Sequence, residues 1–138
     1  METFPVRILA ADRTFFDGVC DSLTIPTSVG EQGILARHSD MLAAVSPGVL
    51  RYRVPGQPVR VAAVSPGMLK VENGVVLVLV DSAEYPEEID AARAKREADE
   101  AREAILQQKS RQEYQLAQAT LARALNRLRV KSGGVGGA

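Results

Sequence analysis

Two different spacings of apolar residues divide the chain. Up to about residue 84, apolar and polar positions alternate in short runs that turn residues separate. After Pro86, apolar residues recur at intervals of three and four. A period of two is typical of strands and a period near 3.6 is typical of helices. The sequence therefore predicts a strand-rich part followed by a helical part.

Turn residues indicate how the predicted strands pair. The tetrapeptide Pro55-Gly56-Gln57-Pro58 separates two such runs, and Asn73-Gly74 separates the next two. Asn-Gly is a strong hairpin signal because both residues tolerate the positive φ of a tight turn. The predicted strands cover residues 4–10, 15–19, 21–26, 49–54, 59–64, 68–72 and 75–80. Short strands with this punctuation predict an antiparallel β-sandwich over residues 1–84.

The helical part contains two heptad-like seams. The first seam consists of Ala91, Ala94, Ala98, Ala101 and Ile105, and the second of Tyr114, Ala117, Leu121, Ala124 and Leu128. Each predicts a helix of roughly 20 residues, about 30 Å long. The short connection around residue 109 requires an antiparallel hairpin over residues 85–131, with Ser110 and Glu113 as a capping box. Residues 132–138 are rich in glycine and are expected to be disordered. The expected fold class is α+β in two parts.

Composition excludes several classes of protein. The 138 residues carry no formal net charge, which gives no electrostatic support for nucleic-acid binding. No apolar run approaches the roughly 20 residues needed to span a bilayer, and the N-terminus lacks a signal-peptide pattern. We therefore expect a soluble protein.

Cys20 is the single cysteine, so no internal disulfide forms, and its place in a strand favours a small core residue.

Charge is distributed unevenly in the last third of the chain. Residues 84–103 hold eight acids and four bases, and residues 104–138 hold one acid and six bases. An antiparallel hairpin brings the start of its first helix beside the end of its second. Three acids are therefore expected to face three arginines at the open end: Glu87, Glu88 and Asp90 opposite Arg123, Arg127 and Arg129. Such exposed pairs contribute only about 0–1 kcal/mol each.

No catalytic or metal-binding constellation is evident. His38 is the single histidine, and the Cys20/His38 and Asp81/Glu84 pairs are weak candidates for chemistry. Phosphate-binding loops of the Walker type are absent. We therefore expect no catalytic residues, no metal site and no enzymatic activity of the chain itself.

Two stretches give the chain a resemblance to a known family. They are GILARHSDMLAAVSPGVL at 33–50 and VENGVVLVLVDSAEYPEEIDAARAK at 71–95. In order, spacing and two-part architecture they resemble the epsilon subunit of bacterial F-type ATP synthases. The family pattern has a proline where Ala36 stands, and Tyr85-Pro86 is an unusual start to the linker. Pro86 is expected to stiffen that linker.

The resemblance implies a non-catalytic part of the rotor. The sandwich would dock on the gamma subunit and the c-ring, with the 31–41 loop and its residues Glu31, His38 and Met41 toward those partners. His38 as an ordinary surface histidine is the alternative. The hairpin would either fold against the sandwich or extend along gamma into the alpha/beta head, where it inhibits ATP hydrolysis. The implied location is the cytoplasmic face of the bacterial inner membrane, peripheral to it.

The resemblance also implies a regulatory ATP site, with no cofactor required. Some members of the family bind ATP through an (I/L)-D-x-x-R-A motif and arginines of the second helix. The matching residues are Ile89, Asp90, Arg93 and Ala94 with Arg123 and Arg127, and Asp90 or Glu84 would accept an amino or hydroxyl donor. A further basic position of the family is acidic here, at Asp99-Glu100. Two alternatives remain: these charges only pair across the hairpin, or the chain is a free-standing ATP sensor.

Overall fold

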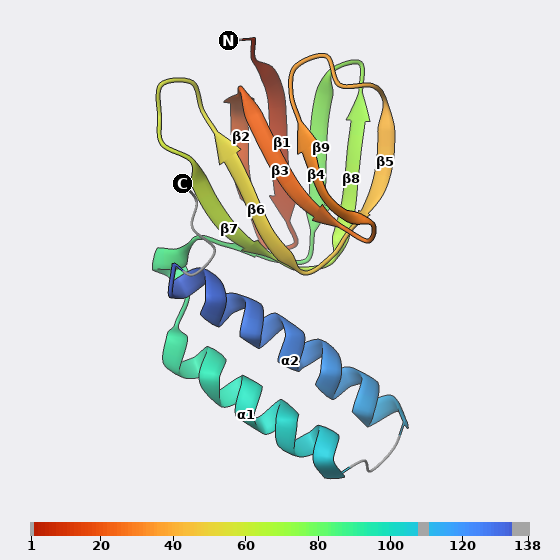
Figure 1. Cartoon of the computed structure of the whole chain (residues 1–138), viewed down its shortest axis with the longest axis vertical. Coiled ribbons are helices and arrows are strands. Elements are labelled where there is room, and N and C mark those ends of the chain that lie inside the picture. Colours follow the sequence, from red (N-terminus) through yellow and green to blue (C-terminus); the bar gives the residue numbers. More distant parts are fainter. Residues whose placement is uncertain (1, 108–110, 134–138) are drawn as a thin grey trace.

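The computed structural model describes residues 2–107 and 111–133. It has two parts, a β-sandwich and a helical hairpin (Figure 1). The hairpin meets one end of the sandwich with its open end, and the rest of its length extends away from the strands (Figure 1). The predicted α+β class, with an N-terminal sandwich and a C-terminal hairpin, is confirmed.

Ten strands form one continuous sheet that folds into the two layers of the sandwich. The strands are β1 (Phe4–Ala10), β2 (Thr14–Cys20), β3 (Ser22–Thr27), β4 (Gly30–Ile34), β5 (Met41–Val45), β6 (Gly48–Arg53), β7 (Arg60–Val64), β8 (Gly67–Glu72), β9 (Val75–Val80) and β10 (Ala83–Glu84). Their order is β10-β7-β6-β3-β5-β8-β9-β1-β2, with β4 paired to β3. The pairing of β1 with β9 is parallel, and the other pairings are antiparallel.

Alternation places one face of strands such as β9 in the core. On β9, Val76, Val78 and Val80 are buried while the residues between them face outward. Cys20 is fully buried in the same core, as its strand position predicts, and burial raises the pKa of its thiol to about 11. A thiol in this environment is protonated at neutral pH and serves packing.

Both predicted hairpin turns are confirmed. At Asn73-Gly74 the φ angles are 52° and 75°, and Glu72 pairs with Val75 across the turn. The chain approaches itself most closely at Gly67, where a Cβ would lie 1.8 Å from the carbonyl oxygen of Leu79. Glycine is therefore required at the start of β8.

Strands β4, β5 and β10 were not among the predicted strands. β4 reads GEQGI and has two glycines, which disfavour a strand when only local sequence is considered. It forms because β3 supplies a full antiparallel partner, from Leu23–Ile34 to Thr27–Gly30. The expected 31–41 loop is therefore a strand as far as Ile34, and β5 begins at Met41.

The helical part contains two α-helices joined in an antiparallel hairpin (Figure 1). They are α1 (Ala91–Gln107) and α2 (Arg111–Lys131), and the short 3-10 helix η1 (Pro86–Glu88) precedes them. The buried alanines of the seam are Ala94, Ala98, Ala101, Ala117 and Ala124. Neither described helix is long and apolar enough to cross a membrane. Ser110 and most of the predicted tail lie outside the described residues.

A small apolar cluster attaches the hairpin to the sandwich. Ile89 and Val130 are buried against Val49 and Ala63 of β6 and β7. Beside this cluster, the amide of Asn126 donates a 2.8 Å hydrogen bond to the carbonyl oxygen of Gly48. The hairpin is therefore fixed through its open end, over few residues.

The linker is packed more firmly than the hairpin it leads to. The Tyr85 ring stacks on Phe15 at 4.3 Å, and its hydroxyl lies 2.6 Å from that of Tyr52. Burial raises the pKa of Tyr52, so the phenol of Tyr52 stays neutral in this hydrogen bond. Pro86 begins the 3-10 turn, as expected for a residue with a fixed φ. The linker thus belongs to the sandwich up to this turn.

Candidate functional site

A polar pocket of about 500 Å³ lies where the hairpin meets the sandwich. Its lining comes from the β1–β2 turn, the end of the sheet, η1 and both helices. The lining residues are Asp12, Arg13, Ser82, Ala83, Glu84, Glu88, Arg93, Glu97, Arg123 and Arg127. Four of the predicted site residues meet here, namely Glu84, Arg93, Arg123 and Arg127.

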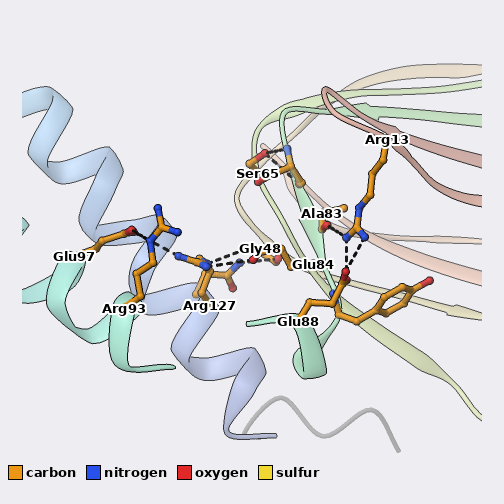
Figure 2. A network of polar contacts seen from close by, with 12 residues as sticks. Arg13, Gly48, Ser65, Ala83, Glu84, Glu88, Arg93, Glu97 and Arg127 are labelled. Carbon is orange, nitrogen blue, oxygen red and sulfur yellow. Dashed lines mark hydrogen bonds and ion pairs between the residues drawn. The ribbon is translucent and has the colours of Figure 1, made fainter. Parts of the chain in front are cut away.

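Arg127 of α2 is the centre of this pocket (Figure 2). Its Nε lies 2.8 Å from one oxygen of Glu84, and its Nη2 lies 3.2 Å from the other. Its Nη1 lies 3.4 Å from Glu97 of α1. The Arg127 side chain is only 14% exposed, so solvent weakens these pairs less than it weakens surface pairs. Arg127 therefore joins the sandwich, α1 and α2 at one point.

The other two hairpin arginines are more accessible. Arg93 is exposed and its Nε lies 3.2 Å from the second oxygen of Glu97. Arg123 is exposed on α2, and within the described part of the chain it has no hydrogen-bond or ion-pair partner. Both guanidinium groups are available to an incoming anion, and planar guanidinium donors suit phosphate and carboxylate groups.

The remaining residues of the Ile-Asp-x-x-Arg-Ala motif hold the hairpin in place and do not line the pocket. Ile89 is buried in the small cluster that attaches the hairpin. Asp90 precedes α1 and its Oδ1 accepts a 3.1 Å hydrogen bond from the backbone N–H of Arg93, which is an N-cap. Ala94 is fully buried in the seam between the helices. The carboxylates among the arginines are therefore Glu84 and Glu97, and Asp90 is not one of them.

The expected pairing of the hairpin's first acids with the arginines of α2 is wrong. Glu87 pairs with Arg60 of β7 at 2.9 Å, and Glu88 accepts two hydrogen bonds from Arg13, at 2.6 and 2.8 Å. The 3-10 turn directs both side chains toward the sandwich, and the hairpin begins only after them. The hydrogen bond from Arg13 lowers the pKa of Glu88, and the same contact raises the pKa of Arg13.

Arg13 and Glu97 are among the pocket residues that were not predicted from the sequence. Arg13 lies in the β1–β2 turn, far from the hairpin in sequence, and no local signal points to it. Glu97 stands four residues after Arg93, a spacing that is readable as a helical ion pair. Its second contact, to Arg127, depends on the tertiary arrangement.

The pocket is balanced in charge. Its arginines are Arg13, Arg93, Arg123 and Arg127, and its acids are Asp12, Glu84, Glu88 and Glu97. Among the described residues no group of three or more side chains is arranged to hold a metal ion. The arrangement supplies anion-binding donors with internal counter-charges, which suits a polyanion such as a phosphate chain.

The three residues predicted to meet rotor partners lie apart from this pocket. Glu31 is exposed on β4, 3.4 Å from Arg51. The Nδ1 of His38 donates to the carbonyl oxygen of Ser39 at 2.7 Å. Met41 begins β5 and packs against the core. Before His38, Arg37 has a positive φ of 64°, so the turn forms without the proline that Ala36 replaces.

An exposed apolar row crosses the outer face of β5, β8, β9 and β1. Ala44 pairs with Met68, Met68 with Leu79, and Leu79 with Leu9. Leu42, two residues before Ala44 and on the same face, is 68% exposed, and Met68 and Leu79 are 41% and 45% exposed. Contiguous exposed apolar side chains of this kind mark surfaces that contact another protein.

Comparison with known proteins gives a match along both parts of the chain. Residues 3–86 match the family model of the ATP synthase delta/epsilon chain beta-sandwich domain, and residues 87–132 match that of its long alpha-helix domain. The ATP synthase epsilon chain of Ruminiclostridium cellulolyticum is 41% identical over 93% of this chain and 95% of that protein. That of Caldanaerobacter subterraneus is 37% identical over 95% of each.

Two solved structures share the fold. A chain in the mitochondrial ATP synthase of Euglena gracilis, described as OSCP/F1/c-ring in rotational state 1, has a TM-score of 0.78 and 24% identity. The likeness covers 88% of this chain and 76% of that one. A chain of the central stalk and c-ring of the Tetrahymena thermophila enzyme has a TM-score of 0.62 and 13% identity, over 92% and 95%.

Proposed function

This chain belongs to the family of ATP synthase epsilon chains, and we propose that it works as a non-catalytic rotor subunit in the central stalk of a bacterial F-type enzyme. The observation that carries the proposal is the match of both the sandwich and the hairpin to this family. A rotor subunit couples the proton-driven turning of the c-ring to ATP synthesis in the alpha/beta head. This role places the chain on the cytoplasmic side of the inner membrane, held there by the complex.

The exposed apolar row supports gamma as the direct partner of the sandwich. Leu79, Met68 and Leu42 lie together on one face, whereas Glu31 and His38 add polar groups elsewhere on the same domain. An apolar centre with polar residues around it is the usual composition of a protein–protein interface. In the proposed arrangement gamma covers this row and the c-ring meets the 31–41 segment.

Co-purification with gamma tests the rotor assignment. The wild-type chain is expected to form a stable complex with gamma, and Leu79→Asp is expected to weaken it about tenfold or more, as for a central interface residue. Leu106→Asp is the matched control, because Leu106 is 82% exposed near the far end of α1. Failure of the wild-type chain to bind gamma would refute the proposal.

The hairpin is proposed to be the movable, inhibitory part. Its seam is made of alanines, and each methyl group contributes only about 0.8 kcal/mol of burial. Its attachment consists of the Ile89/Val130 cluster, the Asn126 hydrogen bond and the Arg127 pairs. A small free-energy difference between attached and extended states is what a ligand or partner requires in order to shift the equilibrium.

The pocket is proposed to be a regulatory ATP site that favours the attached state. Arg93, Arg123 and Arg127 would bind the phosphates, and because all three lie on the hairpin beside Glu84 of the sandwich, a ligand there bridges both parts. Calorimetric titration of the isolated chain with ATP is the test. Arg93→Ala and Arg127→Ala are expected to abolish the heat of binding, and Arg96→Ala, on a different part of α1, is expected to leave it unchanged.

A further inference from the structure

We propose that Glu97 is an internal competitor for the anion in this pocket, and that it sets how tightly the pocket binds a triphosphate. The inference rests on the proposed ATP site and concerns a residue outside the family motif. Glu97 is the one pocket acid that contacts arginines of both helices. It therefore occupies the position between α1 and α2 where a phosphate group would be held.

The contacts of Arg127 use three of the five N–H donors that a guanidinium group carries. Its Nε and Nη2 bond to Glu84, and its Nη1 bonds to Glu97. A phosphate that binds Arg127 through two parallel hydrogen bonds must share the Nη1 and Nη2 groups with the two carboxylates. Guanidinium groups form hydrogen bonds of similar kind with carboxylate and phosphate, so the exchange is a direct competition.

Glu97 is the carboxylate that is easier to displace. The Glu84 pair is bidentate, at 2.8 and 3.2 Å, whereas the contacts of Glu97 with Arg93 and Arg127 are single, at 3.2 and 3.4 Å. Glu84 also belongs to the short strand β10, which fixes its backbone to β7. Glu97 lies on the exposed hairpin, where a change of rotamer moves its carboxylate toward solvent.

Charge leads to the same conclusion. With all four acids present the pocket's formal charges cancel, and neutralising Glu97 alone leaves an excess of one positive charge. It also replaces two charged contacts, with the Nε of Arg93 and the Nη1 of Arg127, by at most a weaker hydrogen bond to a neutral amide oxygen. Arg123 is already accessible beside them. The three arginines then form a set of donors from both helices, suited to a chain of phosphates.

The test is calorimetric titration of the full chain with ATP and, separately, with inorganic triphosphate. Glu97→Gln is expected to bind both ligands roughly tenfold more tightly than the wild type, since hydrogen bonds with charged partners are the strong ones. Glu103→Gln is the matched control, because it makes the same charge change farther along α1, and Glu103 is exposed and does not line this pocket. Its affinity is expected to stay within about twofold of the wild type, as exposed charges are well screened.

The unliganded melting temperature gives a second readout. Loss of the two Glu97 ion pairs is expected to leave Glu97→Gln no more stable than the wild type without ligand, yet more stable with saturating ATP. A purely structural role of Glu97 would lower stability in both conditions and would not tighten binding. A change in the order of the two melting temperatures when ATP is added therefore distinguishes competition from a purely structural role.

Two results would overturn the inference, and they differ in what they imply for the ATP site. Equal affinities of the wild type, Glu97→Gln and Glu103→Gln would refute the role of Glu97 and leave the ATP site standing. Absence of binding in all three, with no heat for either ligand, would refute the ATP site as well.

Discussion

Single residues of the Ile-Asp-x-x-Arg-Ala motif have separate physical roles. Ile89 anchors the hairpin on the sandwich, Asp90 caps α1, and Ala94 allows the helices to approach. Only Arg93 reaches the pocket. A periodicity in the sequence cannot show which side chains of the motif point toward a ligand. That depends on the 3-10 turn at Pro86, which sets where the first helix begins.

Removing the cap of α1 is expected to weaken the hairpin. Asp90→Ala deletes the acceptor for the backbone N–H of Arg93, and loss of an N-cap costs about 1 kcal/mol. Asp90→Asn keeps a side-chain oxygen and is expected to retain most of that stability. Urea unfolding followed by circular dichroism measures the difference. Equal stabilities of the two variants would contradict the capping role.

The Glu88 carboxylate makes stability depend on pH. Its pKa is lowered in the folded state by the hydrogen bond from Arg13, so its contribution is fully present above the unfolded pKa, near 4.5, and is lost as pH falls through the lower folded value. The melting temperature of the wild type should therefore exceed that of Glu88→Gln at pH 6, and the difference should shrink by pH 3. A difference that stays constant with pH would exclude this pair as its source.

Among the elements, the predictions that held were those in which local pattern and tertiary packing agree. The alanine seams and both hairpin turns follow from spacing and from Asn-Gly chemistry. Strand β4 was missed because pairing with β3 outweighs its two glycines. The pairs of Glu87 and Glu88 with the sandwich were missed because no sequence pattern shows that the chain turns before the helix starts.

The helices α1 and α2 lie so close together that a side chain larger than alanine is not expected to fit in the seam between them. Ala124 is fully buried, and Ala124→Leu should destabilise the hairpin by about 1–3 kcal/mol through overpacking. Ala119 is exposed on the same helix, so Ala119→Leu is the control and should change stability by less than about 0.5 kcal/mol. Hydrogen exchange of the helix amides measures the stability of the hairpin in both variants. Similar protection in the two variants would argue against a tight seam.

At the scale of the whole molecule, a firmly packed sandwich carries a lightly attached hairpin. The linker is held by Tyr85 stacking and by the Arg13–Glu88 pair, so the part able to move begins after Glu88. The family assignment drawn from two short motifs is confirmed by the matches of both domains. The regulatory behaviour of the hairpin follows from neither the motifs nor the fold, because it depends on a small free-energy difference between the attached and extended states.

Detaching the hairpin should expose its first helix, α1, to proteolysis. Val130 is 1% exposed in the attachment cluster, and Val130→Asp would bury a charge among Ile89, Val49 and Ala63. Cleavage of the full chain at Glu97 of α1 by a glutamate-specific protease should then accelerate roughly tenfold or more, because burial of a polar group costs at least about 1–3 kcal/mol. Leu116→Asp, at a 69% exposed position of α2, should leave cleavage unchanged.

The most direct test of a rotor subunit with an inhibitory hairpin is the rate of ATP hydrolysis by the reassembled complex. It is measured with the full chain and with a chain that ends at Pro86, which keeps all ten strands. The account predicts that both chains bind gamma and that the truncated one gives faster hydrolysis. The same rate with both chains would contradict an inhibitory hairpin.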